Sequence, residues 1–130
     1  MGVEMVPRLV LDPTDKTIER ICRACGKEGV RWFNWLRALE WRCRNKPGAY
    51  CAYVWDEDGF YAGSWTKNGF RLAVIAVVPE KRGQGLGKKM LEHLILQMKV
   101  RGVHKLTFRT DPKSPAFRWW LRRGAKVVGF

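Results

Sequence analysis

Three glycines at alternate positions, Gly83, Gly85 and Gly87, lie in a basic segment that reads Arg-Gly-Gln-Gly-Leu-Gly-Lys over residues 82–88. An apolar stretch precedes this segment and a helical pattern follows it, so its free backbone N–H groups and the helix dipole should converge on one spot. Because glycine has no Cβ, the backbone there can approach an anion closely. The segment therefore predicts a phosphate-binding turn.

The glycine pattern differs from two common nucleotide-binding loops. A Walker A loop needs glycine where Arg82 stands and serine or threonine where Lys89 stands. The dinucleotide fingerprint has two residues between its last two glycines, whereas one residue separates Gly85 from Gly87. On the glycines alone, a tight turn with no ligand remains the alternative.

Hydrophobic periodicity predicts the elements that position this turn. Asp-Gly and Asn-Gly between β-rich runs predict tight hairpins. The run 72–78 is apolar on both faces, which predicts a strand at the centre of the sheet. The expected order is a strand at 5–11, helices at 13–27 and 30–44, strands at 50–55, 60–66 and 70–78, a helix from the glycine turn to Gly102, a strand at 104–109, a helix from Pro115 to Gly124 and a last strand at 125–130.

Composition indicates one packed domain with a strong positive charge. The 130 residues are 46% hydrophobic, and 25 Lys and Arg against 12 Asp and Glu give a net charge of +13. Residues 81–130 hold thirteen basic and two acidic side chains, so this part alone carries +11. We therefore expect anionic partners near the C-terminal half.

Four cysteines, Cys22, Cys25, Cys43 and Cys51, raise the question of disulfides or zinc. No secretory signal pattern precedes them, so we expect free thiols and a cytoplasmic protein. A zinc site needs tight pairs on turns, and the first pair falls inside a predicted helix, so we expect no metal. The longest apolar run, 72–79, is far shorter than the ~20 residues of a membrane span, so we expect no membrane association.

The stretch from Val77 to Gly87 resembles the acyl-CoA-binding signature of the GNAT superfamily of N-acyltransferases. That signature reads Arg/Gln-x-x-Gly-x-Gly/Ala after a strand ending in Val-x-Pro, and Arg82, Gly85 and Gly87 occupy its positions. Downstream, Pro115-Ala116 and residues 119–125 are similar to the family's Ala, Leu-Tyr, Gly-Phe spacing. Two spaced motifs are more specific than one.

The resemblance implies an α/β fold with the order β-α-α-β-β-β-α-β-α-β, and a mixed, mostly antiparallel central sheet flanked by helices. Residues 1–130 would form a single N-acetyltransferase domain. Acetyl-CoA would be the acyl donor, with its pyrophosphate on the amides of the turn and its pantetheine arm along the edge of the preceding strand. The cofactor-binding residues implied are Val77, Val78, Arg82, Gly83, Gln84, Gly85, Leu86, Gly87 and Lys88.

The sequence differs from the family at the positions of residues that transfer protons. Trp120 stands at the position of the family's tyrosine, which protonates the leaving thiolate, and an indole N–H is far too weak an acid for that role. Lys113 and Ala125 replace the family's asparagine and aromatic residue. Of Trp119 and Trp120, we expect one to pack in the core and the other to line the acyl groove.

A general base that deprotonates an ammonium acceptor is also hard to identify. Asp111 follows the strand beside the groove and is the first candidate, with a helix cap as its alternative role. Glu80 is a second candidate, and His104 lies at the wrong end of its strand. Tyr61 could act as an acid only if its strand face points into the groove.

The sequence thus predicts an enzyme, an N-acetyltransferase in which a primary amine attacks acyl-CoA directly in a ternary complex. A small amine, a protein lysine, a peptide N-terminus and a nucleobase all remain open as acceptors. The alternative is a basic module on the same fold that binds nucleic acid or another anionic partner after losing its proton-handling residues. Both a monomer and a homodimer are compatible with the sequence.

Overall fold

The computed structural model describes residues 6–12, 15–46 and 48–127, which form a mixed α/β fold of the predicted class. None of the helices in these ranges is long and apolar enough to cross a membrane. The elements are β1 (Arg8–Val10), α1 (Lys16–Ala24), α2 (Gly26–Cys43), β2 (Tyr50–Trp55), β3 (Gly59–Trp65), β4 (Gly69–Val77), the 3₁₀ turn η1 (Pro79–Lys81), α3 (Leu86–Arg101), β5 (Lys105–Thr107) and α4 (Pro115–Arg122).

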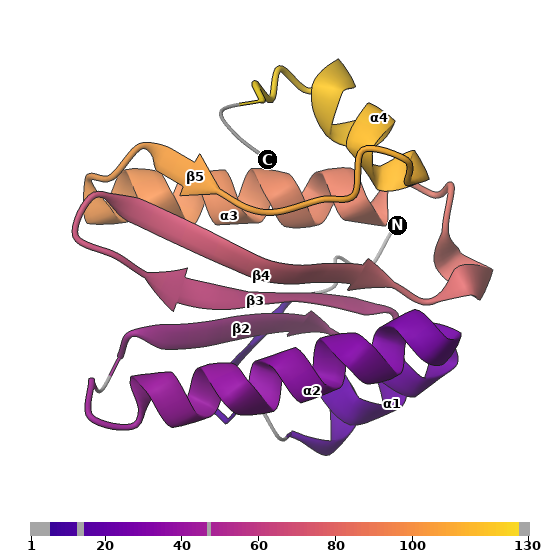
Figure 1. The fold of residues 1–130 in the computed structure, drawn as a ribbon, viewed down its shortest axis with the longest axis horizontal. Coiled ribbons are helices and arrows are strands. Elements are labelled where there is room, and N and C mark those ends of the chain that lie inside the picture. The colour runs from indigo at the N-terminus through magenta and orange to yellow at the C-terminus, as the bar shows by residue number, and fades with distance from the viewer. Residues whose placement is uncertain (1–5, 13–14, 47, 128–130) are drawn as a thin grey trace.

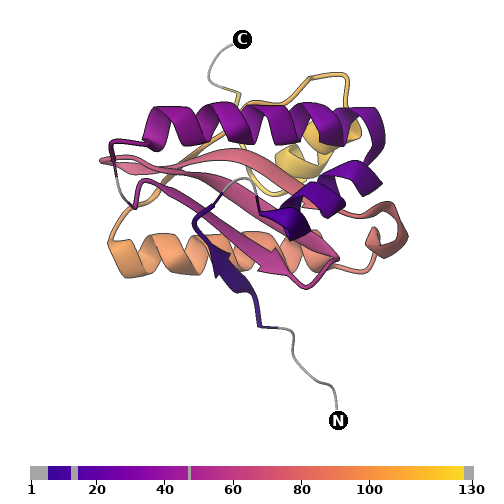
Figure 2. The same ribbon diagram turned by 90° about the horizontal axis from the view of Figure 1, so that it is seen from below.

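One five-stranded sheet, in the order β1-β2-β3-β4-β5, divides the molecule into two layers of helices. Helices α1 and α2 cover one face, α3 covers the other, and α4 lies at the edge of the sheet next to β4 and β5 (Figure 1). Figure 2 shows α1 and α2 along their face, with α3 across the sheet from them. Neighbouring strands are antiparallel except β4 and β5, which are parallel. Both predicted hairpins are present, joining β2 to β3 and β3 to β4.

Each face of the sheet has its own hydrophobic core. The core under α1 and α2 contains Ile18, Ile21, Leu36, Val74 and Ala76, all buried. The core under α3 and α4 is built from larger side chains, and its buried members are Cys51, Trp55, Tyr61, Phe70, Leu72, Met90, Leu91, Leu94, Met98 and Trp120. Because a buried core lies on each face of the sheet, the helices that cover these cores position the glycine turn and α4 around β4.

Strand β4 does not lie at the centre of the sheet, contrary to the sequence prediction; β3 does. Strand β5 pairs with β4 only from Gly69 to Arg71, so the rest of β4 has β3 on one side and no strand on the other. Its run is apolar on both faces because helices cover both faces. A register shift also places Ala62 opposite Val74 and Gly63 opposite Leu72, which leaves Ala73 as an extra residue in β4.

Two further expectations about the elements differ from the structure. The predicted last strand at 125–130 is absent over residues 125–127, which have no partner strand, and its remainder lies outside the described residues. Only Cys25 separates α1 from α2, because Gly26 takes a positive φ of 76° and turns the chain at once. Gly29 permits this sharp crossing, since a Cβ there would collide with the Cys22 carbonyl.

A histidine half-buried on α3 makes fold stability depend on pH. The Tyr61 hydroxyl lies 2.8 Å from Nδ1 of His93, and burial lowers the pKa of His93 below its ordinary value of 6.5. As pH falls through about 6.5, the unfolded chain takes up this proton before the folded chain does, so the free energy of unfolding should fall below that pH.

We expect His93→Phe to flatten that slope between pH 7.5 and pH 5 in urea unfolding followed by circular dichroism. Substituting the exposed His104 with Phe is the matched control and should leave the slope in place. A slope unchanged in His93→Phe would show that another group carries the pH dependence.

Candidate functional site

The predicted glycine turn connects the end of β4, through η1, to the first turn of α3. Gly83 and Gly85 have φ values of 79° and 85°, and a Cβ on either would point into open space. Gly85 is the N-cap of α3 and offers no side-chain acceptor, and its carbonyl oxygen accepts a hydrogen bond from Lys89 N at 3.1 Å. The N–H groups of the first helical residues therefore point outward without partners in the helix.

Positive charge gathers at the same place. Lys81, Arg82, Lys88 and Lys89 are exposed, and none of them has an ion-pair partner in the described part of the chain. The first turn of α3 holds no acidic side chain. Free N–H donors, the helix dipole and four cations therefore favour binding of a phosphate or pyrophosphate group.

The free edge of β4 begins beside this turn. Val78 N donates to the carbonyl of Asp58 on the β3 side at 2.9 Å, so the carbonyl of Val77 points the other way, to the free edge. That carbonyl accepts a 3.0 Å hydrogen bond from Nε of Arg82 and lies 3.7 Å from Sγ of Cys25. Burial raises the pKa of the Cys25 thiol, although the Arg82 guanidinium opposes this, so the thiol stays neutral and can donate.

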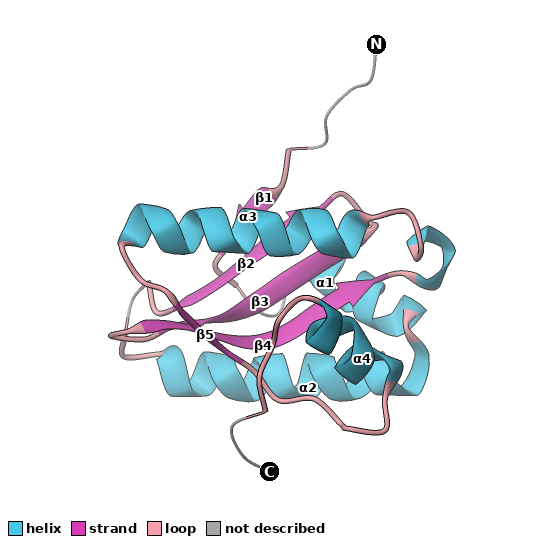
Figure 3. Ribbon diagram, turned by 90° about the horizontal axis from the view of Figure 1, so that it is seen from above, coloured by secondary structure: helices cyan, strands magenta, loops and turns pink. Residues whose placement is uncertain are grey.

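A cleft of about 290 Å³ opens where β4 and β5 separate. Figure 3 shows α4 beside the end of β4, with α2 along the same side of the sheet and α3 along the opposite side. The walls come from α2, from β4 and from the segment leading into α4. The lining residues are Glu28, Arg31, Trp32, Trp35, Leu72, Ala73, Val74, Ile75, Phe108, Arg109, Thr110, Asp111, Ser114, Ala116 and Trp120.

Trp120 both packs in the core and lines this cleft. Its side chain is only 6% exposed, and its ring stacks on Phe108 with 4.0 Å between ring centroids. Trp119 is half-buried beside it, under the Arg123 guanidinium, and its ring would be 3.6 Å from a Cβ on Gly87. Trp119 therefore ties α4 to the glycine turn, while Trp120 faces the cleft.

Asp111 is the one carboxylate predicted for catalysis that lies in the cleft. Its Oδ1 accepts a hydrogen bond from Lys113 N at 2.9 Å, which stabilises the turn before α4 and does not cap the helix, whose N-cap is Ser114. Glu80 lies in η1 and His104 before β5, and neither lines the cleft. Tyr61 points to α3, where it meets His93, so its strand face does not open into the cleft.

Sequence reasoning missed the two charged residues, Glu28 and Arg31, that the start of α2 contributes. Glu28, Arg31, Trp32 and Trp35 line the cleft, and they lie at i, i+3, i+4 and i+7 on one helical face. The helical spacing of the charged residues with the tryptophans was visible in the sequence. That Glu28 and Arg31 would reach the edge of β4 was not visible, because it depends on how α1 and α2 cross.

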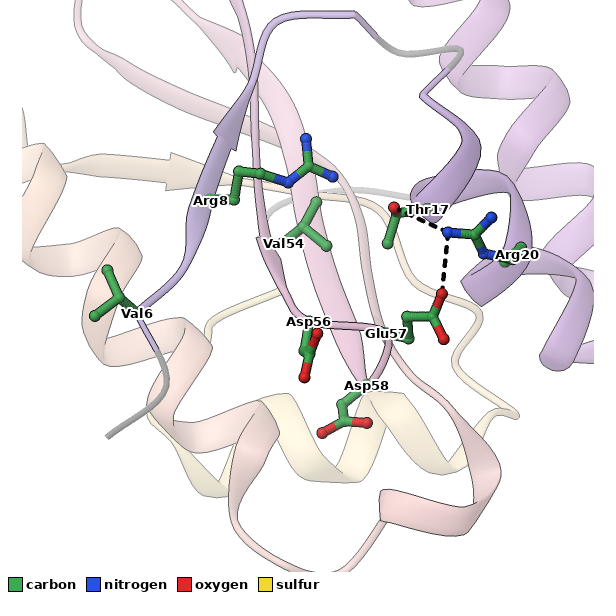
Figure 4. A pocket seen from close by; sticks show the side chains of 8 residues that line it. All are labelled: Val6, Arg8, Thr17, Arg20, Val54, Asp56, Glu57 and Asp58. Atoms are coloured by element: carbon green, nitrogen blue, oxygen red, sulfur yellow. Dashed lines mark hydrogen bonds and ion pairs between the residues drawn. The ribbon is translucent and has the colours of Figure 1, made fainter. Parts of the chain in front are cut away.

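A second, larger hollow of about 610 Å³ lies away from the turn, beside β1 and α1 (Figure 4). Its charged groups partly satisfy one another: Arg20 lies 3.0 Å from Glu57 and 3.4 Å from the Thr17 hydroxyl. The lining residues are Val6, Arg8, Thr17, Arg20, Val54, Asp56, Glu57 and Asp58. We place the functional site at the smaller cleft, where free N–H donors, a free strand edge and a carboxylate meet.

The described residues contain no group of three or more His, Cys, Asp or Glu side chains that could hold a metal ion.

Comparison with known families identifies the family to which the chain belongs. A family model described as an acetyltransferase (GNAT) domain matches residues 45–126, which include β4, the glycine turn, α3 and the cleft-lining segment before α4. No curated protein sequence matches the chain significantly.

Solved structures of acetyltransferases share the fold. PaiA N-acetyltransferase from Thermoplasma acidophilum, solved in complex with coenzyme A, superimposes with a TM-score of 0.69 at 18% identity, over 95% of this chain and 91% of that one. An acetyltransferase from Trypanosoma brucei gives 0.64 at 16% identity, over 98% and 96%. The ribosomal-protein-S18-alanine N-acetyltransferase from Escherichia coli gives 0.53 at 25% identity, over 65% and 58%.

Proposed function

Because the chain belongs to the GNAT family of acetyltransferases, we propose that it transfers an acyl group, acetyl in the first instance, from acyl-CoA to a primary amine. The observation that carries this proposal is the continuity of three features. A turn with free N–H donors leads into the free edge of β4, and that edge leads into a cleft that contains a carboxylate. The parts of acyl-CoA follow one another in the same order: a pyrophosphate, an extended arm with amide groups, and a reactive thioester.

The residues of the turn fit the donor in this arrangement. The N–H groups of Gly83, Gln84, Gly85, Leu86, Gly87 and Lys88, with the Arg82 side chain, would hold the pyrophosphate. The free edge at Val77 would pair with the amides of the pantetheine arm, as a strand edge pairs with an extended peptide. The N–H of Val78 donates to the Asp58 carbonyl on the β3 side, so Val78 would hold that edge in place from within the sheet. Arg82 must then release the Val77 carbonyl, to which it donates in this structure.

The chemistry requires the chain to take one proton and to orient the amine. Bound acyl-CoA supplies a thioester carbonyl to which the amine nitrogen bonds, while the C–S bond breaks and the sulfur leaves as a thiolate. Asp111 is placed to accept the proton that the ammonium must lose, because its carboxylate lines the cleft. Trp120 shapes the wall beside it and supplies no proton, so water must protonate the thiolate.

Asp111→Asn should lower kcat/KM for acyl transfer by roughly 100-fold, the low end of what a positioned base contributes. The substitution keeps the Oδ1 acceptor that binds Lys113 N, so the turn before α4 should persist. Release of coenzyme A thiol, followed with a thiol reagent over a panel of primary amines, measures the effect. Glu92→Gln on the exposed side of α3 is the matched control and should match wild type. Equal rates for the Asp111 variant and wild type would exclude this carboxylate as the base.

The charge of α4 favours a second candidate function, binding of a nucleic acid. Arg118 and Arg122 lie four residues apart on α4, are exposed and have no ion-pair partner in the described ranges. Phosphate contacts of this kind weaken steeply as salt rises, because each contact releases condensed counterions.

Reversing Arg118 and Arg122 to Glu should abolish retention of DNA and RNA in filter binding at low salt, while coenzyme A still raises the melting temperature. Reversing Arg37 and Arg42 on α2 changes the net charge equally and should weaken retention only slightly. If wild type retains no nucleic acid at low salt, this second function is wrong.

A further inference from the structure

The cleft presents more open aromatic surface than core packing requires. Trp35 is 56% exposed, and no ring stacking or cation contact involves it in the described part of the chain. Trp32 lies one turn before it and is only partly covered by the core beneath α2. From the other wall, Phe108 and Trp120 contribute a stacked pair whose centroids are 4.0 Å apart. Aromatic side chains therefore line the cleft from two different elements.

The position of Trp35 on its helix shows that it does not simply belong to the core. The residues of α2 that pack against the core on its face of the sheet include Phe33, Leu36 and Leu39, whereas Trp35 lies on the stripe that faces the cleft. Exposure of an indole ring to water is unfavourable in free energy, and a flat or apolar ligand that covers the ring removes this cost. The natural occupant is a ligand that brings its own aromatic ring.

The cleft has no net charge, but it offers carboxylates and indole faces to an ammonium ion on that ligand. Glu28 from α2 and Asp111 from the segment before α4 place one carboxylate on each wall. Arg31 and Arg109 also line the cleft, so these four side chains cancel, and the cleft lacks the positive excess of α4. Indole faces attract cations as well, which adds to the effect of the carboxylates. A polyanion gains nothing here, whereas an organic cation does.

We propose that the acceptor is a small arylalkylamine, a primary amine borne on a short chain attached to an aromatic ring. Its ring would lie between Trp35 and the Phe108–Trp120 stack, with the ammonium toward Asp111 and the Ala73 edge of β4. A cleft of about 290 Å³ is large enough to hold a ligand of this size. This inference rests on the proposed function, because it names the acceptor for the same cleft.

The test measures binding without turnover, so that it is separate from the test of acyl transfer. Isothermal titration calorimetry in saturating coenzyme A, which carries no acyl group to transfer, compares 2-phenylethylamine, 2-cyclohexylethylamine and n-butylamine. We expect 2-phenylethylamine to bind about tenfold more tightly than n-butylamine and more tightly than its saturated analogue, because only the aromatic ring stacks on indole.

Two tryptophans on the same helix provide a matched pair of variants. Trp35→Ala should abolish the preference for 2-phenylethylamine, and Trp35→Phe should retain most of it. Trp41→Ala removes an indole that is 68% exposed on α2 but does not line the cleft, and it should leave the preference intact. Circular dichroism melts confirm that each variant is folded.

Equal affinities of the wild-type protein for the three amines would overturn the inference, as would the same loss of preference in the Trp41 and Trp35 variants. Absence of any amine binding would overturn it too. None of these three results requires acyl transfer, and the proposed function fails separately if wild type neither binds coenzyme A nor releases its thiol with any amine.

Discussion

Gly85→Val should remove the stabilisation of the protein by coenzyme A. In wild type, millimolar coenzyme A should raise the melting temperature, since a ligand that binds only the folded state stabilises it by mass action. Gly85 has a φ of 85°, and a branched side chain there would point into the open space in front of the free N–H groups. The variant should show no shift in thermal melting with and without coenzyme A.

Gly102→Val controls for strain in the same helix. Gly102 ends α3 with a φ of 72°, and a Cβ there also meets open space. Either substitution forces a β-branched residue into the left-handed region, at a cost of about 1–2 kcal/mol. Gly102→Val should therefore lower the melting temperature but keep the shift with coenzyme A. Loss of the shift in both variants would mean that strain in α3, and not the turn, explains the result.

Trp120→Tyr should raise the rate of acyl transfer. If protonation of the thiolate limits the rate, a positioned phenol contributes roughly 100- to 10,000-fold, which an indole cannot supply. The side chain at this position lines the cleft next to Phe108, so a hydroxyl there would be near the reacting groups. Thiol release measured across pH with a panel of amines gives the comparison.

Trp120→Phe separates the effect of the hydroxyl from the effect of the smaller ring. Both variants remove part of a side chain that is only 6% exposed, so both should lose stability by a similar amount. Only the tyrosine should gain activity. Equal rates for the Tyr, Phe and wild-type proteins would show that no acid is missing at this position.

Local signals in the sequence predicted most of the fold. Asp58-Gly59 and Asn68-Gly69 marked the two hairpins because such pairs accept the backbone that tight turns need. The alternate glycines and the helical pattern after them marked the turn and α3. The place of β4 could not be predicted in this way, because a run that is apolar on both faces is equally compatible with a centre and with an edge covered by helices.

The site was predictable only where it depends on contiguous residues. The turn from Arg82 to Lys88 has the free N–H groups that its glycines indicated, and Asp111 and Trp120 both reach the cleft. The contribution of Glu28 and Trp35 depends on a one-residue junction between α1 and α2, where Gly29 packs against the Cys22 carbonyl. Such a crossing is a tertiary property that helical periodicity does not contain.

Transfer of a labelled acetyl group tests the central proposal most directly. Wild-type protein is incubated with acetyl-CoA carrying a ¹³C-labelled acetyl group and a mixture of primary amines, and the products are identified by mass spectrometry. We predict labelled N-acetyl amine and free coenzyme A in equal amounts, both reduced to the level of the protein-free reaction in Gly85→Val. Label that stays on coenzyme A, or that appears only as acetate, would contradict the account.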